Sequence, residues 1–282
     1  MKTLIFIALS AALVMCCGCG SQTKTVNITL VAKALDSEWW QRVKAGAEAA
    51  AKAHPGVRLA VLAPDREVNI DQQVSILEDQ ITKRVAALVV APAGAVEVVP
   101  VLDRAHAAGI PVVIFDTDVN WPSKVSFVGS DNRRAGQIAG EYILKTLGGK
   151  GKVAVIRGIL GVLTHEDRLA GFRDAIGNTG GIHCVAVLPG NSERALGMSV
   201  MEDLLTRHPD LLAVFATNDQ MALGLRPSSF VFVAKLVSRF LAAECPVDPD
   251  TLSIHATVPG VGFDLQGPKV PDPALPQALP RK

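Results

Sequence analysis

Polar and aromatic residues that could bind a small polyhydroxy ligand follow apolar segments of this chain. Trp39 and Trp40 come after VNITLVAK and the loop ALDSE, Asp116 ends IPVVIF, and Asn218 and Asp219 follow LLAVFAT. A flat indole suits stacking on the apolar face of a sugar-like ring, and a carboxylate accepts hydrogen bonds from two neighbouring hydroxyls. If the apolar segments are parallel strands, these groups lie at the carboxyl ends of a sheet, where open α/β folds bind ligands.

Each of these residues also has a structural interpretation. The two tryptophans could anchor the core, Asp116 could cap the following loop, and Asn218 could be a helix N-cap. Arg168 is predicted in the first turn of a helix, where its charge opposes the helix dipole. It therefore needs a partner, which is either a ligand oxygen or a surface carboxylate.

No motif typical of an enzyme is present. The six histidines are scattered without the spacing of a zinc helix, and no G-x-S-x-G occurs. The run His165-Glu166-Asp167 looks catalytic, but adjacent residues at a helix start point in different directions, so we expect a solvated start of a helix. Gly158 and Gly161 follow a strand, yet a single G-x-x-G is a weak signal. No catalysis, metal or cofactor is predicted.

Composition limits the partners of the chain. Its 282 residues suit two domains, and 49% of them are hydrophobic, enough for a sizeable core. The net charge is +1, from 28 basic and 27 acidic residues. This balance offers no electrostatic reason to expect nucleic acid or an anionic membrane surface as a partner.

Residues 1–20 are predicted to be a lipoprotein signal peptide. The apolar stretch from Leu4 to Val14 is shorter than the roughly 20 residues that span a bilayer as a helix. It is followed by CCGCGS, in which a cysteine after small residues resembles a lipidation site. We expect lipidation at Cys19, with Cys16 or Cys17 as alternatives. A plain secretory signal is the other interpretation.

The rest of the chain alternates short apolar segments with amphipathic ones, which is typical of parallel sheets covered on both faces. The pattern restarts near Gly129, so we predict an N-terminal α/β lobe at 21–129 and a C-terminal α/β lobe at 130–225. Nine of the seventeen prolines lie in 226–282, which predicts a divergent, partly disordered tail. Helices are predicted at 37–52, 69–83, 133–147, 166–176 and 193–207.

Five segments carry a resemblance to a known family. They are LVAKALDSEWWQRVKAGAEAAAK, GIPVVIFDTDV, FVGSDNRRAGQIAGEYI, GKVAVIRGILGVLTHEDRLAGF and HPDLLAVFATNDQMALG. Together they resemble the periplasmic sugar-binding proteins of ABC importers, in the ribose-binding-like group, over residues 26–224. The resemblance implies two doubly wound parallel-sheet lobes of the type I periplasmic-binding-protein fold, which close on a ligand between them.

The resemblance also implies ligand contacts, by matching position. Trp39 and Trp40 would stack on the ligand, and Asp116 would accept from its hydroxyls. The remaining polar contacts would come from the basic and amide side chains, with a late carboxylate in the segment VGFD. These remaining residues are Lys33, Arg168, Asn218 and Asp264.

The sequence departs from the family pattern in three places. Ser192 stands where many relatives have an aromatic residue, so a second stacking wall is missing. Thr117 stands where ribose binders have an arginine, which argues against ribose itself. VGFD comes far later than in relatives, so we expect the second lobe to be incomplete at its C-terminal end.

By this resemblance the chain is a solute-binding lipoprotein, not an enzyme. It would capture a small sugar or polyol in the periplasm or at the cell surface, as a lipid-anchored monomer, and deliver it to an ABC permease. Two alternatives stay open: a truncated or frameshifted remnant without function, and a sugar or autoinducer receptor for signalling.

Overall fold

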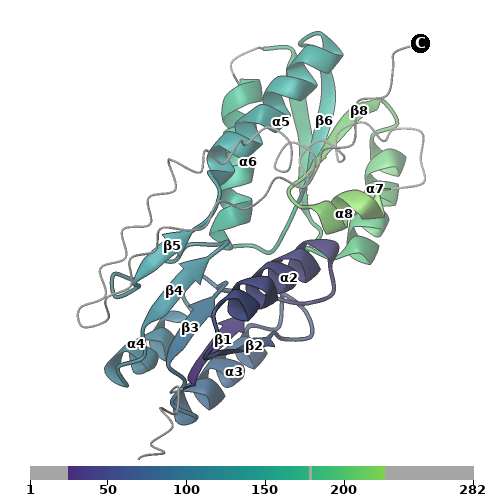
Figure 1. Ribbon diagram of the computed structural model, residues 1–282. Helices are drawn as coiled ribbons and strands as arrows, with labels where there is room; N and C mark the ends of the chain where they lie inside the picture. The colour runs from purple at the N-terminus through teal and green to yellow at the C-terminus, as the bar shows by residue number, and fades with distance from the viewer. Residues whose placement is uncertain (1–24, 178–179, 226–282) are drawn as a thin grey trace, which may run out of the picture.

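The computed structural model describes residues 25–177 and 180–225, which form two α/β lobes (Figure 1). The predicted signal peptide with Cys19, the tail at 226–282 and Asp264 lie outside the described residues. The first lobe has a parallel sheet in the order β2-β1-β3-β4-β5, and the second has a parallel sheet in the order β7-β6-β8. The predicted fold class, α/β with two parallel-sheet lobes, is confirmed.

The first lobe contains β1 (Val26–Val31), α2 (Glu38–Ala53), β2 (Val57–Leu62), α3 (Ile70–Thr82), β3 (Ala87–Val90), α4 (Val99–Ala107), β4 (Val112–Phe115) and β5 (Ser126–Val128). The second lobe contains α5 (Asn132–Leu147), β6 (Gly151–Arg157), α6 (Leu163–Gly177), β7 (Ile182–Pro189), α7 (Arg194–Arg207), β8 (Leu211–Ala216) and α8 (Asp219–Gly224). No described helix is long and apolar enough to cross a membrane.

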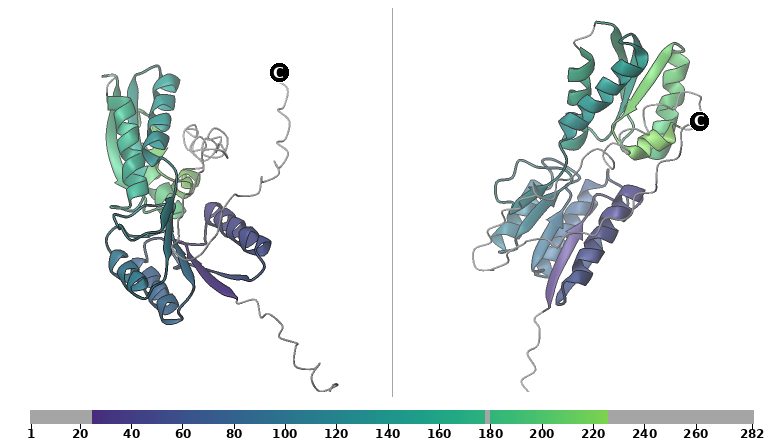
Figure 2. Two further views of the ribbon diagram at one scale, coloured as in Figure 1. Left: turned by 60° about the vertical axis from the view of Figure 1, so that its left-hand side comes forward. Right: turned by 45° about the horizontal axis from the view of Figure 1, so that its top comes forward.

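Each sheet has an apolar core on both faces, because successive side chains of a strand point to opposite faces. In the first lobe, Val31 packs into the core beneath α3 and α4, whereas its neighbour Leu30 packs into the core beneath α2. In the second lobe, Val155 packs with α5 and α6, and Ile156 packs with α7 and α8. Figure 2 shows the helices on the two sides of each sheet. Continuous apolar strands are therefore required.

The helix α6 begins three residues before the predicted start at Glu166. The carbonyl of Val162 accepts hydrogen bonds from the backbone N–H groups of His165 at 2.9 Å and Glu166 at 3.2 Å, so the helical turn starts there. No Ser, Thr, Asp or Asn precedes Leu163 to mark the start in the sequence. This shift moves His165 from a predicted solvated position into the second lobe's interior.

The helices α5 and α6 approach each other closely through glycine. A Cβ atom at Gly136 would lie 2.0 Å from the carbonyl oxygen of Arg168, and one at Gly171 would lie 1.8 Å from that of Arg133. Distances below 3.0 Å between a Cβ and backbone atoms cannot be relieved by turning a side chain. The glycines thus set how near Arg168 lies to α5.

We expect Gly136→Ala to lower the free energy of unfolding by about 1–3 kcal/mol, because the added methyl group overpacks two helix backbones. Gly46→Ala on α2 is the matched control, since its Cβ would meet nothing within 4 Å. There the exchange should raise the free energy of unfolding by about 0.5–1 kcal/mol. Urea unfolding measures both. Equal stabilisation by the two variants would contradict the close helix contact.

Candidate ligand-binding site

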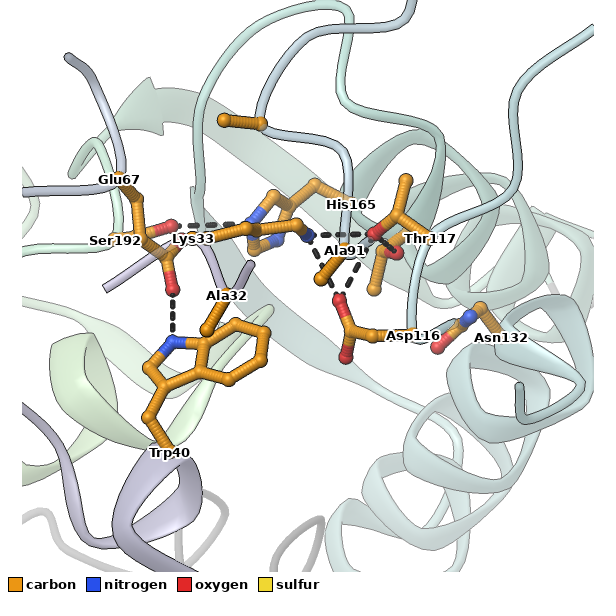
Figure 3. Close-up of polar contacts among 12 residues, drawn as sticks. Ala32, Lys33, Trp40, Glu67, Ala91, Asp116, Thr117, Asn132, His165 and Ser192 are labelled. Carbon is orange, nitrogen blue, oxygen red and sulfur yellow. Dashed lines mark hydrogen bonds and ion pairs between the residues drawn. The ribbon is translucent and has the colours of Figure 1, made fainter. Parts of the chain in front are cut away.

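Polar side chains from the carboxyl ends of both sheets meet between the two lobes. Lys33 follows β1, Asp116 and Thr117 follow β4, and Thr164 and His165 lie in the first turn of α6. Figure 3 shows Lys33, Asp116, Thr117 and His165 together with Trp40, Glu67 and Ser192. Asp116 lies at the strand end where the sequence predicts it, and Lys33, which only the family resemblance implied, lies beside it.

A buried ion pair joins two strand ends of the first lobe. The Nζ atom of Lys33 lies 2.9 Å from Oδ2 of Asp116, and the side chains are 4% and 13% exposed. Burial alone would raise the pKa of the Asp116 carboxyl, but the Lys33 ammonium outweighs it, with help from Arg168 and Thr117, so this pKa is lowered. Asp116 is therefore an ionised acceptor, and Lys33 neutralises it.

Asp116 also has an unusual backbone conformation. Its φ is 62°, in the left-handed region that non-glycine residues rarely adopt and that costs of order 1–3 kcal/mol. Its N–H still donates to the carbonyl of Val128 at 2.9 Å, so β4 holds its register up to this residue. Strain of this kind persists where the surrounding structure fixes it, and it is concentrated at binding sites.

The hydroxyl of Thr117 connects the two lobes. It accepts a hydrogen bond from Lys33 Nζ at 2.5 Å, donates to Asp116 Oδ2 at 3.0 Å and hydrogen-bonds the hydroxyl of Thr164 in the second lobe. This oxygen carries one proton and two lone pairs, so all of its hydrogen-bonding capacity is satisfied when Thr164 is the second donor. A residue noted in the sequence only as a departure thus bridges the lobes.

Arg168 lies in the second turn of α6, so the predicted position in the first turn is wrong. Its partners are neutral oxygens: Nε donates to Asn132 Oδ1 at 2.9 Å and an NH group donates to the carbonyl of Thr217 at 2.7 Å. Burial lowers the pKa of the guanidinium, and the charge of Asp116 opposes this shift. Arg168 therefore presents a positive charge from the second lobe toward a carboxylate of the first.

The two tryptophans have different environments. Trp40 is 3% exposed, and its Nε1 donates to a carboxylate oxygen of Glu67 at 2.7 Å. Its ring meets Phe115 edge to face, with centroids 6.3 Å apart. Trp39 is 47% exposed at the start of α2. Trp40 is therefore packed in the core, in agreement with the anchor interpretation, whereas Trp39 is half exposed.

His165 is buried, so the predicted solvated position is wrong. Its Nδ1 lies 2.9 Å from Thr217 Oγ1, and its Nε2 lies 3.1 Å from Ser192 Oγ. Gly158 makes room for the ring, because a Cβ there would lie 2.3 Å from it. The pKa of His165 lies well below its usual range, mainly because the ring is buried. The nearby positive charges of Arg168 and Lys33 lower it further.

Ser192 occupies the position where an aromatic wall was considered missing. It is 8% exposed, and both Ser192 and the preceding Asn191 have left-handed backbones, with φ of 63° and 48°. Two consecutive strained residues aim this hydroxyl at His165. The second lobe therefore has a polar group here.

Two further polar residues brace the site. Gln73 on α3 is fully buried, and its Nε2 donates to the carbonyls of Ala32 and Ala91 at 3.0 and 2.9 Å, which ties the ends of β1 and β3 together. Asn218 is the N-cap of α8, and its Oδ1 accepts from Met221 N at 3.0 Å. The capping interpretation of Asn218 is confirmed, and its amide nitrogen is not used in that bond.

The sequence did not identify Glu67, Thr164, His165 or Gln73 as residues of this site. Glu67 lies in the long loop after β2, not directly at the strand end, so strand-end reasoning passes over it. His165 has no spacing signal, because its partners Ser192 and Thr217 are distant in sequence. Among residues 25–177 and 180–225, no group of three His, Cys, Asp or Glu side chains could hold a metal ion.

Comparison with known proteins gives consistent similarities. Residues 28–228 match the model of the family described as periplasmic binding protein domain. The chain is 38% identical over 205 residues to the D-ribose/D-allose-binding protein of Pseudomonas aeruginosa, which covers 70% of this chain and 64% of that protein. It is 34% identical over 198 residues to a ribose import binding protein of Escherichia coli, covering 70% of this chain and 66% of the relative. The chain thus spans slightly less than two thirds of each.

A solved structure shares the fold. It is an ABC transporter periplasmic solute binding protein from Actinobacillus succinogenes with bound D-allose, with a TM-score of 0.65 and 30% identity. The match covers 71% of this chain and 72% of that one.

We expect acid to destabilise the protein through His165. Because its folded pKa lies well below the unfolded value, only the unfolded chain binds a proton just below pH ~6.5, so the free energy of unfolding falls there by up to about 1.4 kcal/mol per pH unit. His165→Gln removes this titration. The difference in free energy of unfolding between wild type and variant should therefore shrink from about pH 7.5 to about pH 5.5.

The matched control is His183→Gln, at an exposed position of β7. Burial raises the pKa of Glu67, so its titration changes the free energy of unfolding with pH in the opposite direction. Because wild type and His165→Gln both contain Glu67, this contribution cancels in their difference. A difference between wild type and His165→Gln that is constant across this pH range would contradict a buried neutral histidine.

Proposed function

Because this chain belongs to the periplasmic binding protein family, we propose that it binds a neutral cyclic sugar or small polyol between its two lobes. The observation that carries this proposal is Asp116. It is a buried, ionised carboxylate, held in a strained backbone at a strand end and faced by Arg168 from the other lobe. Oppositely charged groups from two lobes suit a ligand whose hydroxyls both donate and accept.

The charge balance of the site favours a neutral ligand. Lys33 is neutralised by Asp116 at 2.9 Å. The positive charge of Arg168 is opposed by Asp116, Asp219 and Glu67. A ligand with a net charge would leave one buried charge uncompensated, which costs several kcal/mol. Hydroxyl groups can join these networks without that cost.

Individual roles follow from the geometry and from the relatives. Trp40, with Trp39 at the open side, would provide the apolar surface for a sugar ring. Asp116 would accept from ligand hydroxyls, and Arg168 and the amide nitrogen of Asn218 would donate to them. Lys33 would donate to a ligand oxygen next to Asp116. Asp264 would add a late carboxylate, by its place in VGFD.

The proposed mechanism is binding without catalysis. The lobes, proposed at 21–129 and 130–225, would be in equilibrium between open and closed forms, and a ligand that touches both favours the closed form by its differential affinity. The closed form would be recognised by the permease of an ABC importer. We propose that the chain works in the periplasm or at the cell surface as a monomer, anchored by a lipid on Cys19.

We expect Asp116→Asn to weaken sugar binding at least about tenfold, since a charge-assisted acceptor is lost and Lys33 is left without its counter-charge. Calorimetric titration with D-ribose, D-allose and a set of other pentoses and hexoses measures the dissociation constants. The control is Asp210→Asn, which breaks only an exposed ion pair with Lys152. Failure of every neutral sugar to bind the wild type would overturn the proposed function.

A further inference from the structure

The carboxyl group of Glu67 lies where loops of the two lobes meet. It accepts the Nε1–H of Trp40 at 2.7 Å in its own lobe, and Ser192 of the other lobe is drawn beside it in Figure 3. The neighbouring residues on these loops form an ion pair, because Arg66 NH1 lies 3.2 Å from Glu193 Oε1. The two lobes are therefore in contact next to Glu67.

Ser192 is held beside Glu67 by contacts within the second lobe. Its hydroxyl lies 3.1 Å from His165 Nε2, and His165 Nδ1 lies 2.9 Å from the Thr217 hydroxyl, whose oxygen accepts from Gly158 N–H at 2.9 Å.

The indole of Trp40 is held at two sides. Glu67 holds its nitrogen edge, as Figure 3 shows, and Phe115 packs against it at a steep angle of 83°. A ring that is fixed in this way presents a face of defined orientation, which stacking requires. Without an acceptor for its N–H, the indole would be free to turn or would leave a buried donor unpaired.

We propose that Glu67 is a specificity-determining positioning residue, which fixes the orientation of the Trp40 indole for a ligand between the lobes. A cyclic sugar, which has a flat C–H face, gains from this arrangement. An acyclic alditol of the same configuration lacks this rigid face, so the site selects rings. This inference rests on the proposed function.

The test compares cyclic sugars with their alditols on the full chain. D-ribose, ribitol, D-allose and allitol are titrated into wild type, Glu67→Met, which removes the acceptor at similar volume, and Glu67→Gln, which keeps a neutral acceptor. We expect Glu67→Met to lose roughly tenfold in affinity for the ring sugars and less than about threefold for the alditols, and Glu67→Gln to stay within about threefold for both. Glu48→Gln, on the exposed side of α2, is the matched control.

A ligand-free measurement separates this inference from the proposed function. Glu67→Met should shift the tryptophan emission and raise its quenching by acrylamide, Glu67→Gln should not, and the shift should vanish when Trp40→Phe is added. If no sugar binds the wild type but this pattern appears, the proposed function fails and the positioning of Trp40 stands. If sugars bind but Glu67→Met behaves like Glu48→Gln, or weakens rings and alditols equally, the inference is overturned.

Trp40→Phe tests the same bond from the other partner, should Glu67→Met fail to fold. It keeps an aromatic ring without the N–H that Glu67 accepts, so it should lower the preference for rings over alditols. An unchanged preference in this variant would overturn the positioning role of Glu67.

Discussion

Charged side chains of both lobes are buried where the lobes meet. Lys33 and Asp116 end two strands of one sheet, and an unpaired charge at either position would cost several kcal/mol. At 2.9 Å they neutralise each other. Because the pair is satisfied, water can be excluded from the region between the lobes while hydroxyl, carboxylate and guanidinium groups remain there to meet a ligand.

The same pairing couples the lobes. Thr117 accepts from Lys33 and from Thr164 across the boundary, and its own proton goes to Asp116. A second contact joins loops of the two lobes, where Arg66 NH1 lies 3.2 Å from Glu193 Oε1. These bonds are few and directional, so opening the lobes breaks a small number of defined contacts and leaves both apolar cores intact. Such an arrangement suits an equilibrium between two discrete forms.

The fold could be predicted from the sequence because its signals are local. Apolar segments such as LLAVFAT alternate with amphipathic helices, and strands that are covered on both faces must be apolar at every position. The start of α6 was misjudged, since no capping residue marks Leu163. That error of three residues placed Arg168 in the wrong turn and His165 in solvent, which shows how strongly side-chain direction depends on helix register.

For the candidate site, the sequence is enough to say which groups follow strand ends, because a βα unit always brings these ends to one edge of a sheet. Asp116 and Asn218 were found in this way, whereas Lys33 came from the family resemblance. The partners of these residues depend on tertiary packing. Trp40 with Glu67, and Ser192 with His165, are joined by contacts between residues 27 positions apart. No local pattern encodes such pairs, because their geometry depends on how two loops, or two lobes, pack.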